Sequence, residues 1–235
     1  MAGLEARLRR HVLKADTRSG RILRAVIMTA RKFTLPVPRP LGMVLLGLYR
    51  LVDAVWGTAF RLLVCEPLLK ARCSRYGTGV RANRYIHWIR GPGDLILGDG
   101  VHLDGKSSVI FARRFAEKPT LEIGPGTYVG HNCSFGVGQR ITIGERCLIA
   151  GDCRFSDSNG HPLDPNLRAE GQPPTKDEVR PITIGNNVWI ATGATLLPGV
   201  IIGDGSVVAT RAVVTGSFPE RSLIAGIPAK LVRLL

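Results

Sequence analysis

The stretch ITIGNNVWIATGATLLPGVIIGDGSVVATRAVVT, residues 182–215, decides the fold of this chain. An aliphatic residue recurs in it at every sixth position: Ile184, Ile190, Leu196, Ile202, Val208 and Val214. The residue that follows is small in every case except Leu197. A helix repeats near 3.6 residues and a simple strand near two, so a strict period of six indicates a β-solenoid.

Each six-residue repeat predicts one short strand followed by a corner. The aliphatic residue points toward the axis, and the next residue is small because the chain turns there. The fifth position also points inward, and it is small or β-branched, as at Val188, Ala194 and Ser206. Successive coils stack at roughly 4.8 Å, so each coil buries the one below it.

These residues resemble the hexapeptide-repeat acyltransferases. The segment ITIGNNVWI is most similar to maltose and galactoside O-acetyltransferases and to polysaccharide-biosynthesis acetyltransferases, and IAGIPAKLVR resembles the end of their repeat region. Counted from Leu97, the resemblance covers a little over half of the chain. It implies an all-β solenoid, a left-handed parallel β-helix with three repeats per coil, although crossovers between parallel strands are usually right-handed.

The charge distribution divides the chain into residues 1–75 and 76–235. The formal net charge is +14, and residues 1–75 hold 15 Lys and Arg residues against 4 Asp and Glu residues. A basic segment on a nearly neutral body predicts an anionic partner, either membrane lipid or nucleic acid, or else a solvated helix surface. Aromatic and basic residues do not alternate as in single-strand binders, so we expect no nucleic acid.

Residues 1–75 read as helices that carry this charge. Apolar residues such as Leu4, Leu8 and Val12 alternate with arginines, and the run LPVPRP stops the first helix. Residues 41–70 are apolar and long enough to span a bilayer, but Arg50, Asp53 and Arg61 interrupt them. We favour an amphipathic helix in the membrane interface over a spanning helix. The alternative is a helix packed on the solenoid or on a neighbouring subunit.

The chain has five cysteines, and their number and spacing indicate neither a disulfide framework nor a zinc site. Cys133, Cys147 and Cys153 occupy the fifth position of their repeats, where we expect small inward-facing core residues. This usage fits a reducing cytosol.

The period is interrupted three times. Residues 111–120 predict a loop, and the repeat slips by two residues between Phe135 and Ile143. Residues 157–181 form one long excursion, rich in proline and charge and without an apolar period. Such a loop without structure of its own, inside a regular scaffold, is usually functional, so we predict the active-site loop here.

His161 is the candidate general base. An alcohol is a poor nucleophile at neutral pH, and histidine titrates near neutrality, so it suits removal of a hydroxyl proton. The resemblance implies the same role, because the similar O-acetyltransferases have their base in a matching GHP segment. This chain continues with Leu163 and Asp164 where the galactoside enzymes have further sugar-binding residues. Asp157, Asp164 or a backbone carbonyl is expected to orient the ring.

The resemblance implies the remaining catalytic residues. Asn132 corresponds to an asparagine that helps to bind the acceptor, although the closest alignment puts Gly130 at that position and His131 is an alternative. The backbone N–H of Thr192, in the segment WIAT, is the expected donor to the oxyanion, with Trp189 on the same groove wall.

Acetyl-CoA is the implied co-substrate, bound along the late coils between two subunits. The residues implied for it are Trp189, Thr192, Thr210, Thr215 and Lys230. Gly216 stands where the galactoside enzymes have a lysine, so Arg211 or Arg233 is an alternative phosphate contact. We expect no metal, because the histidines lack the close pair of a zinc hydratase.

Together these features predict an acyl-CoA-dependent O-acetyltransferase that acts on a carbohydrate hydroxyl, in a glycan or surface-polysaccharide precursor near the membrane. The predicted enzyme is a homotrimer, cytoplasmic, and peripheral on the inner face of the cell membrane. One alternative is an N-acyltransferase on an amino-sugar nucleotide. Another is a non-enzymatic trimeric scaffold, which would have no need of the His161 loop.

Overall fold

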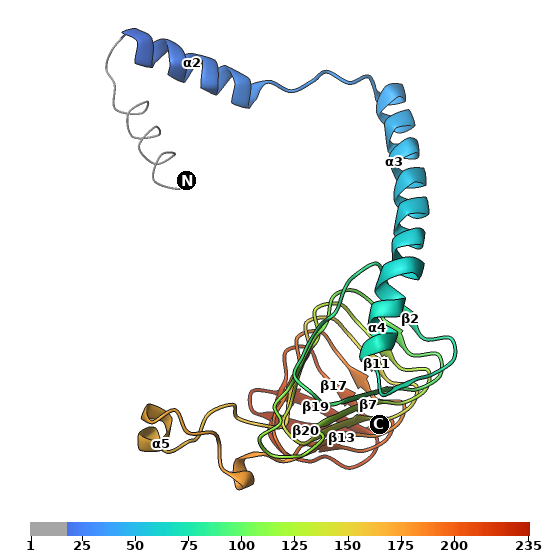
Figure 1. Ribbon diagram of the computed structural model, residues 1–235, viewed down its shortest axis with the longest axis vertical. Helices are drawn as coiled ribbons and strands as arrows, with labels where there is room; N and C mark the ends of the chain where they lie inside the picture. The colour runs from blue at the N-terminus through green and yellow to red at the C-terminus, as the bar shows by residue number, and fades with distance from the viewer. Residues whose placement is uncertain (1–17) are drawn as a thin grey trace. The chain divides into compact units, whose positions relative to one another are not determined.

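The structure is a computed structural model that describes residues 18–235. The chain divides into two compact units, residues 1–53 and 54–235, which are described separately (Figure 1). The predicted boundary after residue 75 lies later in the chain than this division. The helical residues from Ala54 onward therefore belong with the solenoid.

The N-terminal helices follow the order that the sequence predicts. They are α2 (Arg18–Lys32), α3 (Arg39–Phe60), the π-helical turn η1 (Arg61–Cys65) and α4 (Glu66–Arg72). The prolines of the segment 33–38 separate α2 from α3, because a proline lacks a donor and restricts the residue before it. The predicted helical residues Leu4, Leu8 and Val12 lie outside the described residues.

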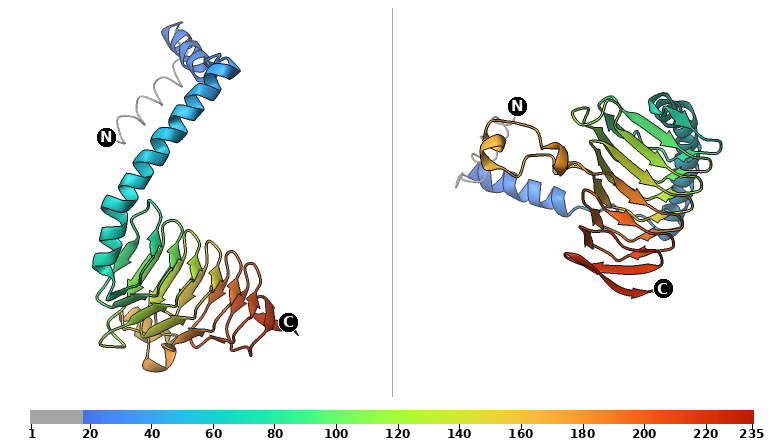
Figure 2. Two further views of the ribbon diagram at one scale, coloured as in Figure 1. Left: turned by 90° about the vertical axis from the view of Figure 1, so that its right-hand side faces the viewer. Right: turned by 90° about the horizontal axis from the view of Figure 1, so that it is seen from below.

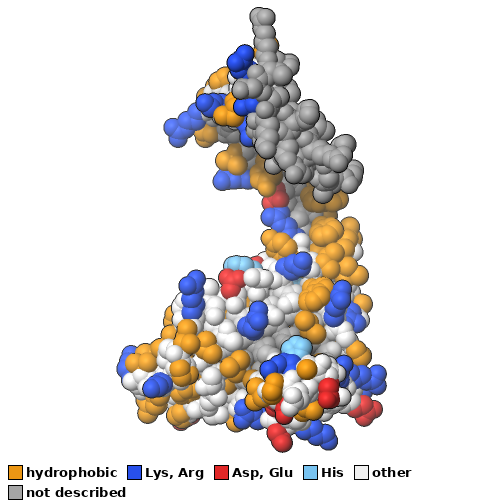
Figure 3. All heavy atoms as spheres, turned by 90° about the vertical axis from the view of Figure 1, so that its left-hand side faces the viewer, with side chains coloured by type: hydrophobic (Ala, Val, Ile, Leu, Met, Phe, Trp, Pro, Cys, Tyr) orange, Lys and Arg blue, Asp and Glu red, His pale blue; other side chains and the backbone are white. Residues whose placement is uncertain are grey.

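Apolar side chains are exposed all around α3. Leu45, Leu48, Val52, Val55 and Trp56 are each more than half exposed, and Figure 3 shows hydrophobic side chains gathered along the helix. The continuous helical stretch Arg39–Arg72 has 34 residues and is long and apolar enough to cross a membrane, by length and composition only. Only 6% of its most apolar 18-residue segment is buried.

Residues 75–235 wind into a three-sided solenoid of parallel strands. Sheet A contains β1 (Arg75–Tyr76), β4 (Asp94–Leu97), β7 (Thr120–Ile123), β10 (Arg140–Ile143), β13 (Ile182–Ile184) and β16 (Ile201–Ile202). Sheet B contains β2 (Arg81–Ala82), β5 (His102–Leu103), β8 (Tyr128–Val129), β11 (Leu148–Ile149), β14 (Trp189–Ile190), β17 (Val207–Val208), β19 (Ser222–Gly226) and β20 (Ala229–Leu234). Sheet C contains β3 (Trp88–Arg90), β6 (Ser108–Phe111), β9 (Ser134–Val137), β12 (Arg154–Ser156), β15 (Thr195–Leu196) and β18 (Val213–Val214).

The pairing register confirms the six-residue period. In sheet A Ile184 pairs with Ile202, eighteen residues later, which is three repeats. The same step joins β14 to β17 in sheet B and β15 to β18 in sheet C, and Figure 2 shows the coils stacked in sequence order. The last coil ends in the antiparallel hairpin of β19 and β20, in which Ile224 is buried and Ile227 is exposed.

The core is a set of stacks along the solenoid axis. Phe135 and Phe155 are fully buried, and their rings stack with centroids 5.0 Å apart. Cys133, Cys147 and Cys153 are buried, as their repeat position predicts, and all five cysteines are free thiols. Burying each large apolar side chain contributes roughly 1.5–3 kcal/mol, so the stacked core is the main source of stability.

All three interruptions leave the solenoid at one edge, where sheet C passes to sheet A. The first spans residues 112–119, because Phe111 and Thr120 already belong to strands. The second lies between β9 and β10, where eight residues instead of six separate Phe135 from Ile143, which is the predicted slip. The third is the long excursion between β12 and β13. We call this line the C–A edge, and the line where sheet B passes to sheet C the B–C edge.

Candidate active site

The long excursion has structure of its own, contrary to the sequence-based expectation. It contains α5 (Pro165–Ala169) and the 3₁₀ turn η2 (Lys176–Glu178), and it projects from the side of the solenoid (Figure 2). Asp164 caps α5, because its Oδ1 accepts hydrogen bonds from the N–H groups of Asn166 and Leu167. Asp164 is therefore engaged in holding the loop.

Short polar contacts tie the excursion together around His161. The Glu178 carboxylate accepts hydrogen bonds from the N–H groups of Leu163 and Thr175, each at 2.7 Å. The hydrogen bond from Leu163 is the largest of the effects that lower the pKa of Glu178. Arg168 donates to the carbonyls of Pro162 and Leu163 at 2.9 and 3.1 Å. The backbone that follows His161 is thus fixed from two sides.

The His161 side chain itself is exposed to solvent. It follows Gly160, which has a φ of +79°, and it precedes the buried Pro162. Within residues 18–235 the imidazole makes no hydrogen bond, so both nitrogens are open to solvent. The excursion presents His161 at the C–A edge.

Asp157 lies at the root of the excursion, and its carboxylate serves the coil below. Its oxygens accept hydrogen bonds from the backbone N–H groups of Gly138, Gln139 and Arg140 at 2.6, 2.7 and 2.8 Å. Burial raises the pKa of this carboxyl, and the three N–H donors oppose that effect. Asp157 therefore supports the two-residue slip, and no hydrogen bond joins it to His161 in the described part of the chain.

The root of the excursion is also closed by backbone pairing. Ser158 forms a bridge with Val179, and the N–H of Arg180 donates to the carbonyl of Asp157 at 2.8 Å. These contacts bring the two ends of a 25-residue segment together, so that the loop begins and ends at one point of the solenoid.

A second group of predicted residues follows the B–C edge. Asn132, Asp152, Gly193 and Arg211 occupy equivalent corner positions in successive coils, all with positive φ. The side-chain amide of Asn132 donates to Asp152 Oδ1 at 2.7 Å, which joins two neighbouring corners. This hydrogen bond holds Asn132 at the B–C edge, whereas Gly130 directly follows strand β8.

Thr192 and Thr210 precede two of these corner residues and are exposed. The carbonyl of Thr192 accepts from the N–H of Arg211 at 3.0 Å, but its own N–H donates no backbone hydrogen bond in residues 18–235. This open N–H has the chemistry that an oxyanion donor requires. Trp189, at 48% exposure, lies on the adjoining strand of sheet B.

The residues that the resemblance implies for the co-substrate are divided between the two edges. Lys230 lies on β20 opposite Ala225, close to the B–C edge of the last coil. Thr215 directly follows strand β18, at the C–A edge. A three-residue strand spans roughly 10 Å. One chain therefore holds His161 and Thr215 at one end of the sheet C strands, and Asn132, Thr192 and Thr210 at the other.

Sequence reasoning missed a polar cluster at the start of the B–C edge. The Asp104 carboxylate accepts hydrogen bonds from Tyr128 Oη at 2.6 Å and from the Asn83 side-chain amide. This bond to Asp104 raises the pKa of Tyr128 to about 12. A signal was present, because Asp104 stands where Gly130, Ala150 and later repeats have a small residue. Among the described residues, no group of three or more His, Cys, Asp or Glu is arranged to hold a metal ion.

Comparison with known proteins shows what the repeats are similar to. The family model described as bacterial transferase hexapeptide (six repeats) matches residues 181–216. The galactoside O-acetyltransferase of Escherichia coli (strain K12) is 36% identical over 119 residues, which are 51% of this chain and 56% of that protein. The chain spans about half the length of the curated relatives that it matches.

Solved structures show the same fold. A polysialic acid O-acetyltransferase superposes with a TM-score of 0.51 at 25% identity, covering 67% of this chain and 72% of that chain. A hexapeptide-repeat acetyltransferase from Vibrio cholerae O1 biovar eltor, complexed with acetyl coenzyme A, has a TM-score of 0.51 at 21% identity over 86% of this chain and 93% of that chain. The predicted left-handed parallel β-helix and the resemblance to hexapeptide-repeat acyltransferases are therefore confirmed.

Proposed function

We propose that the protein is an acetyl-CoA-dependent O-acetyltransferase that modifies a carbohydrate hydroxyl. The observation that carries this proposal is His161, an exposed imidazole on an excursion whose two ends are fixed to the solenoid next to the matched repeats. The sequence similarity to a galactoside O-acetyltransferase supports a sugar as the acceptor. The acetyl-CoA complex of the Vibrio structure supports the fold as a carrier of that co-substrate.

In the proposed reaction His161 accepts the proton of the acceptor hydroxyl as its oxygen attacks the thioester carbonyl carbon. The resulting oxyanion receives a hydrogen bond from the Thr192 N–H. The carbon–sulfur bond then breaks, the CoA thiolate leaves, and the imidazolium returns the proton to it. The products are the acetyl ester and free CoA.

His161 and Thr192 lie at different edges of one chain, so we propose that two copies complete each site. An edge of one subunit packed against the neighbouring subunit brings the base and the oxyanion donor together. A closed trimer provides three such sites. We also propose that the helices of residues 1–75 hold the enzyme on the inner, anionic face of the cell membrane, near a glycan or surface-polysaccharide precursor.

Replacing His161 by alanine tests the proposed chemistry. We expect CoA release in the presence of acetyl-CoA and a panel of sugars to fall by about 10²–10⁴-fold, which is the usual contribution of a general base. The matched control is His102→Gln, on sheet B, which we expect to keep full activity. Undiminished transfer by His161→Ala would contradict the proposed role of this residue.

The product identifies the class of transfer. An ester is cleaved by mild alkali, whereas the amide made by an N-acyltransferase resists it. Acetylated products that survive mild alkali would show that the protein is an N-acyltransferase and not an O-acetyltransferase. No CoA release with any sugar or amino-sugar nucleotide from a folded protein would favour the scaffold.

A further inference from the structure

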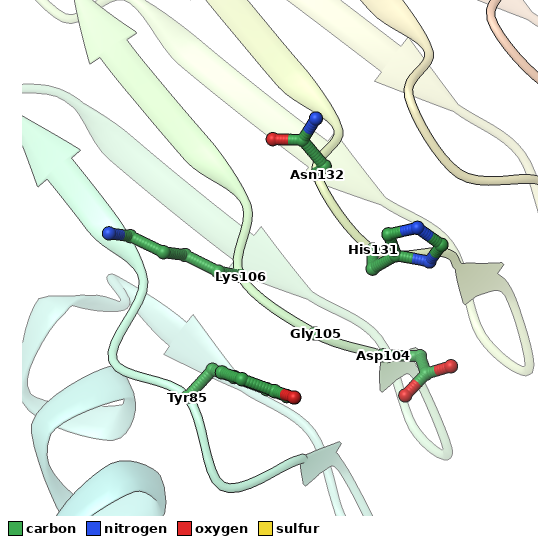
Figure 4. Close-up of a pocket in the computed structure, with 6 residues that line it drawn as sticks. All are labelled: Tyr85, Asp104, Gly105, Lys106, His131 and Asn132. Carbon is green, nitrogen blue, oxygen red and sulfur yellow. The ribbon is translucent and has the colours of Figure 1, made fainter. Parts of the chain in front are cut away.

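A hollow of about 380 Å³ opens on the B–C edge, in the early coils. Three consecutive corners line it: Tyr85 from the first coil, Asp104, Gly105 and Lys106 from the second, and His131 and Asn132 from the third. Figure 4 shows Gly105 at the centre, with Tyr85 on one side and His131 and Asn132 on the other. The hollow thus begins at Asn132 and runs away from Thr192.

Gly105 lets two of the corners that line the hollow approach each other closely. Its φ is +84°, a conformation that side chains rarely adopt. A Cβ at this position would overlap the Cβ of His131. The corner of the second coil can therefore approach the next corner closely only because residue 105 is glycine.

Asp104 is held in a fixed orientation that leaves acceptor capacity free. Tyr128 Oη and the Asn83 amide each donate to one of its oxygens. Each carboxylate oxygen has two lone pairs, so both oxygens retain one for a ligand. A ligand that donates hydroxyl groups would satisfy these remaining lone pairs.

The other walls supply donors and an apolar surface. The ammonium group of Lys106 has no hydrogen bond or ion pair within the described residues, and it offers three donors. The Tyr85 ring is 46% exposed beside it. A flat apolar ring flanked by a fixed carboxylate, an ammonium and an amide matches a sugar, which has an apolar ring face and hydroxyls at its rim.

We infer that this hollow binds sugar units of the acceptor next to the unit that is acetylated, and that the acceptor is a glycan of two or more units lying along the B–C edge. The inference rests on the proposed function. From Tyr85 to Asn132 the hollow crosses two coil spacings, roughly 10 Å. A single sugar reaching the transfer point leaves this length unused, whereas an oligosaccharide fills it.

The test compares acceptors of different length. Acetyl transfer is measured with one-, two-, three- and four-unit members of three linear series: maltose oligomers, chitin oligomers and α2,8-linked sialic acid oligomers. Wild-type protein is compared with Tyr85→Ala, Tyr85→Phe and Lys106→Gln, with Lys118→Gln as an exposed control distant from the hollow. Saturation-transfer NMR measures binding of the same series independently of transfer.

We expect kcat/KM to rise by about tenfold or more from one to three units in a series that is acetylated, mainly through KM. Tyr85→Ala and Lys106→Gln remove most of that rise, Tyr85→Phe keeps most of it, and Lys118→Gln keeps all of it. Transfer that is independent of length, or a rise that survives Tyr85→Ala in folded protein, overturns the inference while leaving the proposed function intact.

If no series is acetylated, these sugars are not acceptors in the proposed reaction. The binding data then decide whether the hollow binds a glycan. Length-dependent binding that Tyr85→Ala abolishes supports it as a glycan site. No binding of any series by wild-type protein overturns it.

Discussion

Asp157 shows how a single carboxylate can join two coils of the solenoid. It follows strand β12, yet its oxygens accept three N–H groups at the two-residue slip of the coil below. Without these bonds the slip would leave backbone donors unpaired where Gly138 is packed against Phe115 and Val179. Asp157 thus joins the coil below to the root of the His161 excursion.

Asp157→Asn should destabilise the protein. The amide keeps the size of the side chain, but its NH₂ group faces N–H donors and it carries no charge. A hydrogen bond to a charged acceptor contributes about 1.5–3 kcal/mol. Because the amide turns one of the two acceptor oxygens into a donor, we expect the free energy of unfolding to fall by about 2–3 kcal/mol. Urea denaturation measures the loss. The control is Asp152→Asn, an exposed carboxylate with one side-chain partner, for which we expect less than about 1 kcal/mol.

The role of Asp157 could not be predicted from the sequence. Its position four residues before His161 suggested an orienting carboxylate, whereas its partners lie 17–19 residues earlier. Such partners become neighbours only once the lengths of the coil and of the slip are known. The position of His161 depends on local features, namely one aperiodic segment and one histidine within it, and for this reason the sequence was informative there.

At the scale of the elements, His87 occupies the junction between α4 and the first coil. It lines a cavity of about 210 Å³ together with Cys65, Leu69 and Arg72. The N–H of Ser107 donates to its Nδ1 at 3.3 Å, so Nε2 carries the proton, and that buried atom has no partner within residues 18–235. Burial lowers the pKa of His87 to about 4.

We expect this junction to make stability depend on pH. An unfolded histidine titrates near 6.5, so below that value the unfolded chain binds a proton that the folded chain does not. The free energy of unfolding is therefore unaffected by His87 above pH 6.5. It decreases as the pH falls from 6.5 toward 4, by at most about 3 kcal/mol. Denaturation midpoints measured across this range should fall less for His87→Gln than for wild type. An equal slope in both proteins would contradict the assignment, and His102→Gln serves as the control.

The elements were predictable to different degrees. From residue 182 to residue 215 every inward position follows the period of six, and the structure pairs these residues in that register. The first coil is less regular, because five residues separate β2 from β3 where later corners have four. The hollow beside Tyr85 is lined by side chains from three coils. Its parts are spread along the sequence, so no local pattern indicates it.

At the scale of the whole molecule, the chain combines a solenoid with a basic, apolar helical segment. In a soluble helix apolar residues form one stripe, whereas α3 exposes them on all sides. The positive charge of residues 1–75 complements anionic lipid headgroups. Both observations support the membrane as the partner of this segment.

Binding to liposomes tests that partner. We expect the full-length protein to float with vesicles that contain phosphatidylglycerol and to bind phosphatidylcholine vesicles more weakly, with the difference reduced by salt. Leu48→Glu should weaken binding by about tenfold or more, because it puts a charge on the apolar surface of α3. Gln172→Glu, which changes the net charge equally on the exposed excursion, should have little effect. A protein that floats with neither kind of vesicle would sink the proposal.

The position of the three interruptions has a consequence for how such a protein can acquire new specificity. They all leave at the C–A edge, and the strands on either side keep their pairing whether two residues or twenty-five connect them. Segments grafted at this edge add surface without shifting any coil. Exchanging one excursion can therefore change the surface beside the proposed acceptor site, while the stacked core carries over unchanged.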